Sequence, residues 1–172
     1  YTLWHTLSLH DALPIYVVYN AHTVDDATIG NGNGQLEQGE DAYLTITTEN
    51  LGVQMAAGVN AVISTDDSLV TVTDSTANYG NIPAGSTAVV DRGFRIMADL
   101  DMPDDYDIPF TMTATDGDST WVSYFVVTGH RPITEFNGLT IDDASGNNNG
   151  NLDPGETTDF DVTVKNNGTG DV

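Results

Sequence analysis

Short stretches in which apolar and polar residues alternate run through the chain from Tyr16 onward. Glu40–Glu49 shows the pattern best, with one apolar and one polar set of alternate positions: Ala42, Leu44 and Ile46 against Tyr43, Thr45 and Thr47. Successive side chains of a strand point to opposite faces, so this period predicts a half-buried β-strand. Further strands are expected at Tyr16–Thr23, Val59–Ser64, Leu69–Thr73, Ala88–Ala98, Ile108–Thr115, Thr120–Val127 and Thr134–Ile141.

Turn residues separate these stretches at intervals of about 8–12 residues, and we find no helical period. Pro83 predicts a bend at Asn78–Gly85 rather than a central strand. The pattern indicates an all-β fold, an immunoglobulin-like antiparallel β-sandwich. Residues 16–131 have the length of one such domain, and Gly129–Ile133 is the expected linker. Residues 132–172 are expected to be the truncated start of a second, similar module, because they are too few to bury a core alone.

One motif occurs twice, from Asp25 to Gly52 and from Asp142 to Gly168. A single one-residue gap aligns the copies at Asp25/Asp142, Asp26/Asp143, Asn31/Asn147, Asn33/Asn149, Gly34/Gly150, Leu36/Leu152, Gly39/Gly155, Glu40/Glu156, Asn50/Asn166 and Gly52/Gly168. Each copy is an oxygen-rich loop followed by an alternating strand. The chain is therefore expected to be a tandem array of related β modules.

The two loops have the composition of a calcium site. An EF-hand loop binds calcium through oxygen ligands at positions that include 1, 3, 5 and 12, with Gly at position 6. With Gly34 or Gly150 at position 6, two asparagines and a glutamate fall at positions 3, 5 and 12. Position 1 is Ile29 or Ser145, so the adjacent aspartate doublet is expected to supply the missing carboxylate. The candidate metal ligands are Asp25, Asp26, Asn31, Asn33 and Glu40, and Asp142, Asp143, Asn147, Asn149 and Glu156.

Two other interpretations of the loops stay open. Asn-Gly pairs favour positive φ, so each loop could be a structural turn that binds no ion, or a different cation could bind. The glutamate that follows the second glycine in both copies, Glu40 and Glu156, favours calcium. One carboxylate doublet and one glutamate per loop predict the weak affinity of extracellular modules.

Other candidate sites carry less. Four aspartates could form a third cation site or a solvated loop: Asp101, Asp104, Asp105 and Asp107. Asp66 and Asp67 are adjacent on a turn, so they do not face each other across a substrate as a glycosidase pair must. His22 and His130 have no visible catalytic partners. Trp121 is expected in the core, with a sugar-stacking platform as its alternative role.

Composition narrows the class of partner. The chain has 26 acidic residues against four basic ones and a net charge of −22. This acidic excess fits both calcium binding and a saline habitat, and composition does not separate the two. Such a surface disfavours nucleic acid and anionic membranes as partners, because both carry negatively charged phosphate. There is no cysteine, and no apolar run approaches the roughly 20 residues of a membrane-spanning helix, so no membrane insertion is expected.

The N-terminal segment Tyr1–Ile15 is expected to be a non-native artefact. Thr6–Ile15 (TLSLHDALPI) resembles the in-frame translation of a common short-read sequencing adapter. We therefore leave this segment out of the fold argument, which removes His5 and His10 from the candidate ligands.

The order of motifs resembles a known family of modules. The loop pattern DD…GNGxLxxGE precedes a strand ending in N-x-G, followed by NYGNIPAGST (Asn78–Thr87), FRIMA (Phe94–Ala98) and a hairpin over Pro103–Val127. This resembles the immunoglobulin-like accessory and adhesion modules of large secreted bacterial proteins, such as gingipain-like and subtilisin-like peptidases. The resemblance implies a non-catalytic role. No residue here matches a peptidase motif.

The leading functional hypothesis is a non-catalytic, calcium-stiffened β-sandwich spacer or adhesion module of a secreted or cell-surface protein, whose partners are calcium ions and the neighbouring domains of its own chain. The alternative is a glycan- or protein-binding module. Exposure of Trp121 would favour the alternative, and burial would favour the spacer. A fragment of a catalytic domain is the third and weakest hypothesis.

Overall fold

The structure, a computed structural model, describes residues 15–172 and is all-β over that range. Eleven strands are formed, and the described residues include no helix, hence none that could cross a membrane. The segment expected to be an artefact lies outside the described residues except for Ile15, which is half-buried against the edge of the core.

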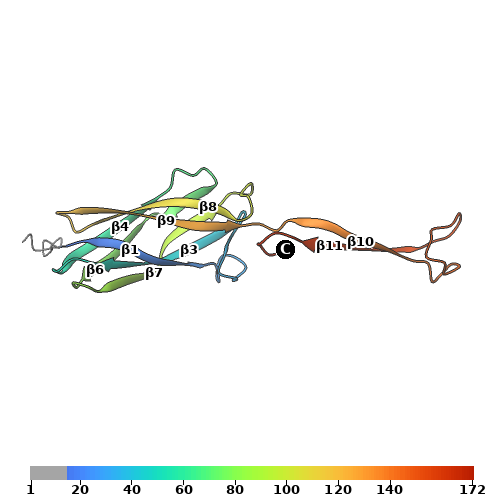
Figure 1. The fold of residues 1–172 in the computed structure, drawn as a ribbon, viewed down its shortest axis with the longest axis horizontal. Coiled ribbons are helices and arrows are strands. Elements are labelled where there is room, and N and C mark those ends of the chain that lie inside the picture. The colour runs from blue at the N-terminus through green and yellow to red at the C-terminus, as the bar shows by residue number, and fades with distance from the viewer. Residues whose placement is uncertain (1–14) are drawn as a thin grey trace, which may run out of the picture.

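Two sheets enclose the main core (Figure 1). The four-stranded sheet has the order β1 (Val17–Asp25), β3 (Asp41–Asn50), β7 (Thr87–Ala98) and β5 (Val70–Asp74). The five-stranded sheet has the order β2 (Leu36–Glu37), β9 (Thr120–His130), β8 (Tyr106–Thr115), β4 (Ala56–Ser64) and β6 (Thr76–Ile82). All pairings are antiparallel except the short one between β2 and β9.

The two sheets are joined along both edges by chain that leaves one sheet and enters the other. Strand β5 pairs with β7, and after a single residue, Ser75, the chain continues as β6 on the opposite sheet beside β4. On the other side, β1 pairs with β3, and the loop after it leads into β2, which pairs with β9. Strands that switch sheets in this way close the corners around a core.

The core is built from the alternating positions of both sheets. Both sheets contribute side chains that are at most 1% exposed. From the four-stranded sheet these include Leu44, Ile46, Phe94 and Ile96, and from the five-stranded sheet Ile63, Ile108, Phe110 and Met112. The apolar set expected in the third strand of the chain is thus buried. Phe125 stacks on Phe110 within its sheet and on Tyr19 from β1 across the core, with ring centroids 5.2 and 4.8 Å apart.

Strands β10 (Thr134–Asp142) and β11 (Asp159–Asn166) form a separate two-stranded sheet. In Figure 1 this hairpin extends away from the two larger sheets, with its long loop at the far tip. Its apolar side chains are exposed rather than buried: Phe136, Leu139, Phe160, Val162 and Val164.

Sequence reasoning located most strands, but it missed the edge strand β6 and placed the start of the linker too early. The expected bend at Asn78–Gly85 is wrong, because Thr76–Ile82 forms β6. This strand lies at a sheet edge and ends before Pro83, so the missing proline N–H removes no ladder bond. The expected linker begins two residues later than predicted, since Gly129 and His130 belong to β9.

Truncating matched residues in β3 and β11 should separate buried from exposed packing. Ile46→Ala should destabilise the chain by about 2–5 kcal/mol, because Ile46 is fully buried. Val162→Ala, at the equivalent place in the motif repeat, should change the free energy of unfolding by less than about 0.5 kcal/mol, because Val162 is 61% exposed. Urea unfolding followed by far-UV circular dichroism measures both. Equal losses would show that the hairpin shares the main core.

Candidate functional site

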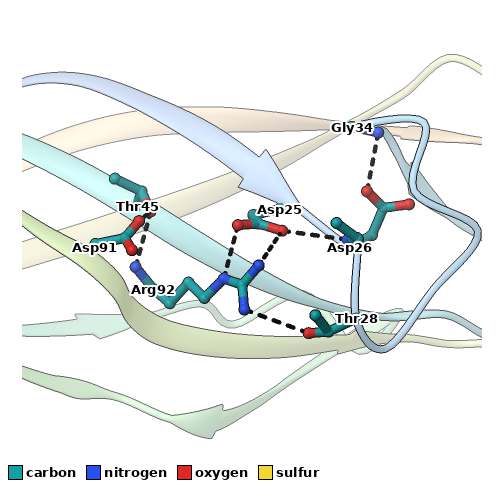
Figure 2. Close-up of polar contacts among 8 residues, drawn as sticks. Asp25, Asp26, Thr28, Gly34, Thr45, Asp91 and Arg92 are labelled. Carbon is teal, nitrogen blue, oxygen red and sulfur yellow. Dashed lines mark hydrogen bonds and ion pairs between the residues drawn. The ribbon is translucent and has the colours of Figure 1, made fainter.

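The first acidic loop connects β1 to β2 and is organised around one buried carboxylate. Asp26 is 1% exposed, and its oxygens accept N–H hydrogen bonds from Gly32 (2.7 Å), Asn33 (3.1 Å) and Gly34 (2.9 Å). Figure 2 shows the bond to Gly34. Gly32 and Gly34 have φ angles of 83° and 78°, a conformation that glycine adopts without strain. The turn can therefore aim three successive N–H groups at one side chain.

Two glutamates close the loop. Glu40 accepts the N–H of Asn31 (3.0 Å) and the N–H of Glu37 (3.1 Å), while its own N–H donates to the carbonyl of Glu37 (3.1 Å). A Cβ at Gly30 would overlap the carboxylate of Glu40, so this position must be glycine for the glutamate to lie where it does. The side-chain amides of Asn31 and Asn33 both donate to Glu37, which is 8% exposed.

The second loop, between β10 and β11, repeats most of this network. Asp143 is 2% exposed and accepts the N–H groups of Asn149 (2.7 Å) and Gly150 (3.2 Å). Glu156 accepts the N–H groups of Asn147 (2.8 Å) and Asp153 (3.2 Å). Gly146 lies under Glu156 as Gly30 lies under Glu40. The repeat seen in the sequence is therefore a repeat of three-dimensional structure.

The strands on either side of the loops repeat as well. Val17 pairs with Asn50 in one sheet and Thr134 with Asn166 in the other, and each first strand has its register shift two to four residues later. Each asparagine side chain accepts the N–H two residues on, from Gly52 (3.0 Å) or Gly168 (2.9 Å). The hairpin β10–β11 thus has the geometry of the β1–β3 pair, at a constant offset in sequence on each strand.

Asp25 differs from the other candidate ligands because a basic residue engages it. The guanidinium of Arg92, from β7, donates from Nε and Nη2 to the two carboxylate oxygens at 2.7 and 3.0 Å, as Figure 2 shows. The Arg92 side chain holds the pKa of Asp25 below its usual range. Asp142, its equivalent in the second copy, is not part of any ion pair within residues 15–172.

The first loop also lies at the junction with the hairpin. Asp171 contacts it twice: its N–H donates to Glu37, and its carboxylate accepts from the side-chain amide of Asn33 at 3.0 Å. Beside this contact, Asp104 accepts the N–H of Arg131 (2.9 Å) and both the N–H and the hydroxyl of Thr169. The Thr169 hydroxyl is the main reason that the pKa of Asp104 is lowered. Of the four aspartates weighed as a third cation site, Asp104 is the one that the junction uses.

The two central carboxylates of the first loop have opposite pKa shifts. Burial by itself raises the pKa of Asp26, but the N–H groups of Gly34, Gly32 and Asn33 favour its charged form and bring the pKa below 3.8. Burial raises the pKa of Glu40, and the negative charges of Asp26 and Glu37 raise it further, against the effect of two N–H donors. The negative charge of ionised Glu40 is therefore offset only in part by its two N–H donors.

The loops offer oxygen atoms, the ligand type that hard cations take. No group of three or more histidine or acidic side chains within residues 15–172 is arranged to hold a metal. A cation would thus be bound by a carboxylate pair, with amide, carbonyl and water oxygens completing its shell. The nearest candidates are Glu37 and Glu40. Of about four acceptor positions on each carboxylate, Glu40 uses two for N–H groups and Glu37 uses three, so the remaining positions are the ones a cation could take.

Sequence reasoning missed one member of each loop. Glu37 and Asp153 occupy equivalent positions, and each accepts the side-chain amides of the two loop asparagines. The one-residue alignment gap already places them opposite each other, at position 9 of the EF-hand template, where that loop has a ligand that often binds through water, so the template itself could have identified them. Among the other candidates, His22 packs beside Tyr19 and Phe125, and Trp121 is half-buried against the core.

Comparison with known proteins gives no relative for this arrangement: no protein-family model matches the sequence, and a search of curated proteins finds no match.

Replacing the central carboxylate should weaken the fold in a pH-dependent way. Asp26→Asn should cost about 1–3 kcal/mol at pH 7, because an amide nitrogen then faces N–H donors. The lowered pKa of Asp26 means that its stabilising effect is present above pH 3.8 and is lost as the pH falls through its folded value. The difference between the two proteins should therefore shrink in acid. Urea titrations at pH 7 and pH 3 in chelator measure it, and a constant difference would contradict the role assigned to the charge.

Proposed function

We propose that this chain is a segment of a tandem, immunoglobulin-like β-sandwich array that serves as a calcium-stiffened spacer or adhesion element of a secreted or cell-surface protein. The role is non-catalytic. The resemblance to accessory modules of secreted bacterial peptidases concerns the parent protein, for which we propose the same class. The neighbouring modules of the same polypeptide are its main partners.

The strand order supports the immunoglobulin-like part of the proposal. In the constant-type fold, strands A, B, E and D form one sheet and C, F and G the other. Strands β1, β3, β7 and β5 follow the first order, and β4, β8 and β9 the second, in matching chain sequence. Strand β6 is an addition between β5 and β7 that pairs with β4.

The position of the first acidic loop carries the functional proposal. This loop is built from Asp26, Glu37 and Glu40 in the first module, and it is also contacted by Asp171, which follows the hairpin of the second. An ion bound here would act on both modules. The second loop lies at the opposite end of the hairpin (Figure 1), where a further module of an array would find the same structure.

Calcium would be held by the residues that the two loops share. Glu37 and Glu40, or Asp153 and Glu156, provide the carboxylate pair. Asp26, Asn31 and Asn33 and their repeats shape the loop and offer oxygens, and Asp25 and Asp142 lie just outside it. The ion supplies positive charge where Asp26, Glu37 and Glu40 otherwise repel one another. Relief of that repulsion would make the junction stiffer.

Calcium should stabilise the whole chain, and Glu40→Gln should remove the effect of the first loop. With a Kd of about 1 mM, about 10 mM calcium stabilises the folded state by about 1.4 kcal/mol, which raises Tm by several degrees. In chelator, Glu40→Gln should lie within about 1 kcal/mol of the parent, since the lost hydrogen bond is offset by lost repulsion. Calorimetry with calcium and with chelator measures both.

Glu49→Gln is the matched control, because Glu49 lies at the other end of β3 and makes its side-chain hydrogen bond to Asn20. It should keep the full calcium response. Residual dipolar couplings give a second measure: the two modules should fit one alignment tensor with calcium and two tensors without it. Identical melting and identical couplings in calcium and chelator would rule out the calcium-stiffened spacer.

A second candidate function, glycan binding, is favoured by a pocket on the outer face of the five-stranded sheet. The pocket has a volume of about 410 Å³ and is lined by Ser64, Thr65, Asp66, Pro109, Thr111, Tyr124 and Val126, with Phe110 and Phe125 beneath. Tyr124 is 75% exposed and offers an aromatic face beside hydroxyls and a carboxylate. An apolar wall with a few polar groups is typical of small-ligand sites. Half-buried Trp121 does not line this pocket.

If this pocket binds glycans, Tyr124→Ala should lower the affinity for the bound glycan by at least about tenfold on a glycan array, because the aromatic platform is removed. Val122→Ala, an exposed neighbour on the same strand that lies outside the pocket, should leave retention unchanged. Chelator should have no effect, since the pocket is separate from the acidic loops. Failure of the parent chain to bind any glycan would dismiss this candidate.

A further inference from the structure

The hairpin β10–β11 repeats the backbone of β1–β3 but not its surroundings. Leu44, Ile46 and Thr48 of β3 are completely buried. Their equivalents in β11, by the motif repeat and the strand register, are 51%, 61% and 63% exposed: Phe160, Val162 and Val164. The same structural unit therefore has a covered apolar face in one copy and an open one in the other.

Strand β7 is what covers the second edge of β3. It pairs antiparallel with β3, placing Phe94 opposite Leu44 and Ile96 opposite Ala42, both buried. Strand β11 has β10 on one edge and no other strand beside it among residues 15–172. Its second edge thus has the unpaired N–H and C=O groups that recruit another strand.

The outer face of the hairpin adds a charge requirement. Asp142 lies directly opposite Asp159, and Asp161 follows two residues on, opposite Thr140. Like charges in directly opposed positions are destabilising. None of the three forms an ion pair with the few basic residues of the described chain. The hairpin therefore presents three carboxylates on this face, two of them on β11, the strand with the free edge.

The equivalent positions in the first module all contact one arginine. They are Asp25, Tyr43 and Thr45, and Arg92 of β7 contacts each of them. Its guanidinium makes two hydrogen bonds to Asp25, and its Cζ lies 5.5 Å from the ring centroid of Tyr43. Its backbone N–H donates to the Thr45 hydroxyl at 2.8 Å. In the hairpin all three positions are aspartates: Asp142 corresponds to Asp25, Asp159 to Tyr43 and Asp161 to Thr45.

We propose that the free edge of β11 is the docking surface for one occupant: an extended β segment that is apolar on its inner face and carries an arginine over Asp142 on its outer face. The inference rests on the proposed function, a tandem array of related modules. The occupant is the strand that pairs with β11 in the second module as β7 pairs with β3 in the first. It runs antiparallel to β11, in the register of β7 on β3. The position that corresponds to Asp91 is not acidic in this segment, because Asp161 replaces the Thr45 hydroxyl that donates to Asp91.

Charge disfavours a second copy of this chain as the occupant. The chain carries a net charge of −22, and antiparallel pairing of two β11 edges centred at Phe160 would bring Asp159 of each hairpin against Asp161 of the other. Apolar burial alone would accept such a dimer, whereas the carboxylates oppose it. The occupant is therefore distinguished from a second copy by its positive charge.

A tethered strand tests the proposal on the full chain. Residues 87–98, with Asp91→Asn in the fused copy, are joined after Val172 through a flexible linker of roughly eight residues, which gives a millimolar effective concentration. Thr87 pairs with Glu49 in the first module, so the fused copy should begin opposite Lys165, near the end of the chain. Amide hydrogen exchange in β11 is then measured by NMR in chelator, with and without the fused strand.

The fused strand should slow exchange at alternate amides of β11 by at least about tenfold. Arg92→Glu in the fused copy should reduce the effect to less than about twofold, and Asp142→Lys in the same molecule should restore it. No slowing, or equal slowing with Arg92→Glu, would overturn the proposal. So would a dimer of the unfused chain with protected β11 amides. Because chelator is present throughout, a failure of the calcium proposal leaves this result unaffected.

Discussion

The buried carboxylate of Asp26, repeated at Asp143, is the interaction on which each module's entrance depends. A carboxylate at 1–2% exposure is costly unless donors surround it, and here the backbone of its own loop supplies them. The loop must therefore turn through positive φ, at Gly32 and Gly34 in the first copy and at Asn148 and Gly150 in the second, and this turn leads into the following strand. The register between the strands on either side follows from that turn, and it is the same in both copies.

A second constraint is the excess of negative charge. The first module neutralises part of it with two arginines of β7, which pair with Asp25 and Asp41 and lie over Tyr43. The acidic loop keeps Glu40 in a partly buried position beside other carboxylates, where its pKa is raised. A cation for the loop and an arginine for the hairpin would relieve the same imbalance at two different places.

The chain that follows β11 contacts both the segment before β10 and the first acidic loop. Gly168 and Gly170 lie so close to the backbone of Arg131 that a Cβ at either would overlap it. The chain after β11 can therefore fold back onto the first module, where Thr169 meets Asp104 and Asp171 meets the first loop. The first loop is stabilised by its own hydrogen bonds, and through Asp171 it also takes part in the contact with the chain that follows the hairpin.

Local chemistry made the loops and most strands predictable from sequence. The bonds within each loop span fewer than ten residues, and the alternation in β3 follows from one buried face, so both are written in neighbouring residues. Contacts between distant residues were not predictable. Asp25 meets Arg92 across 67 positions, and Asp171 meets Glu37 across 134. The same reason explains the edge strand β6 and the exposed face of β11, because whether a strand is covered depends on which partner lies beside it and not on its own pattern.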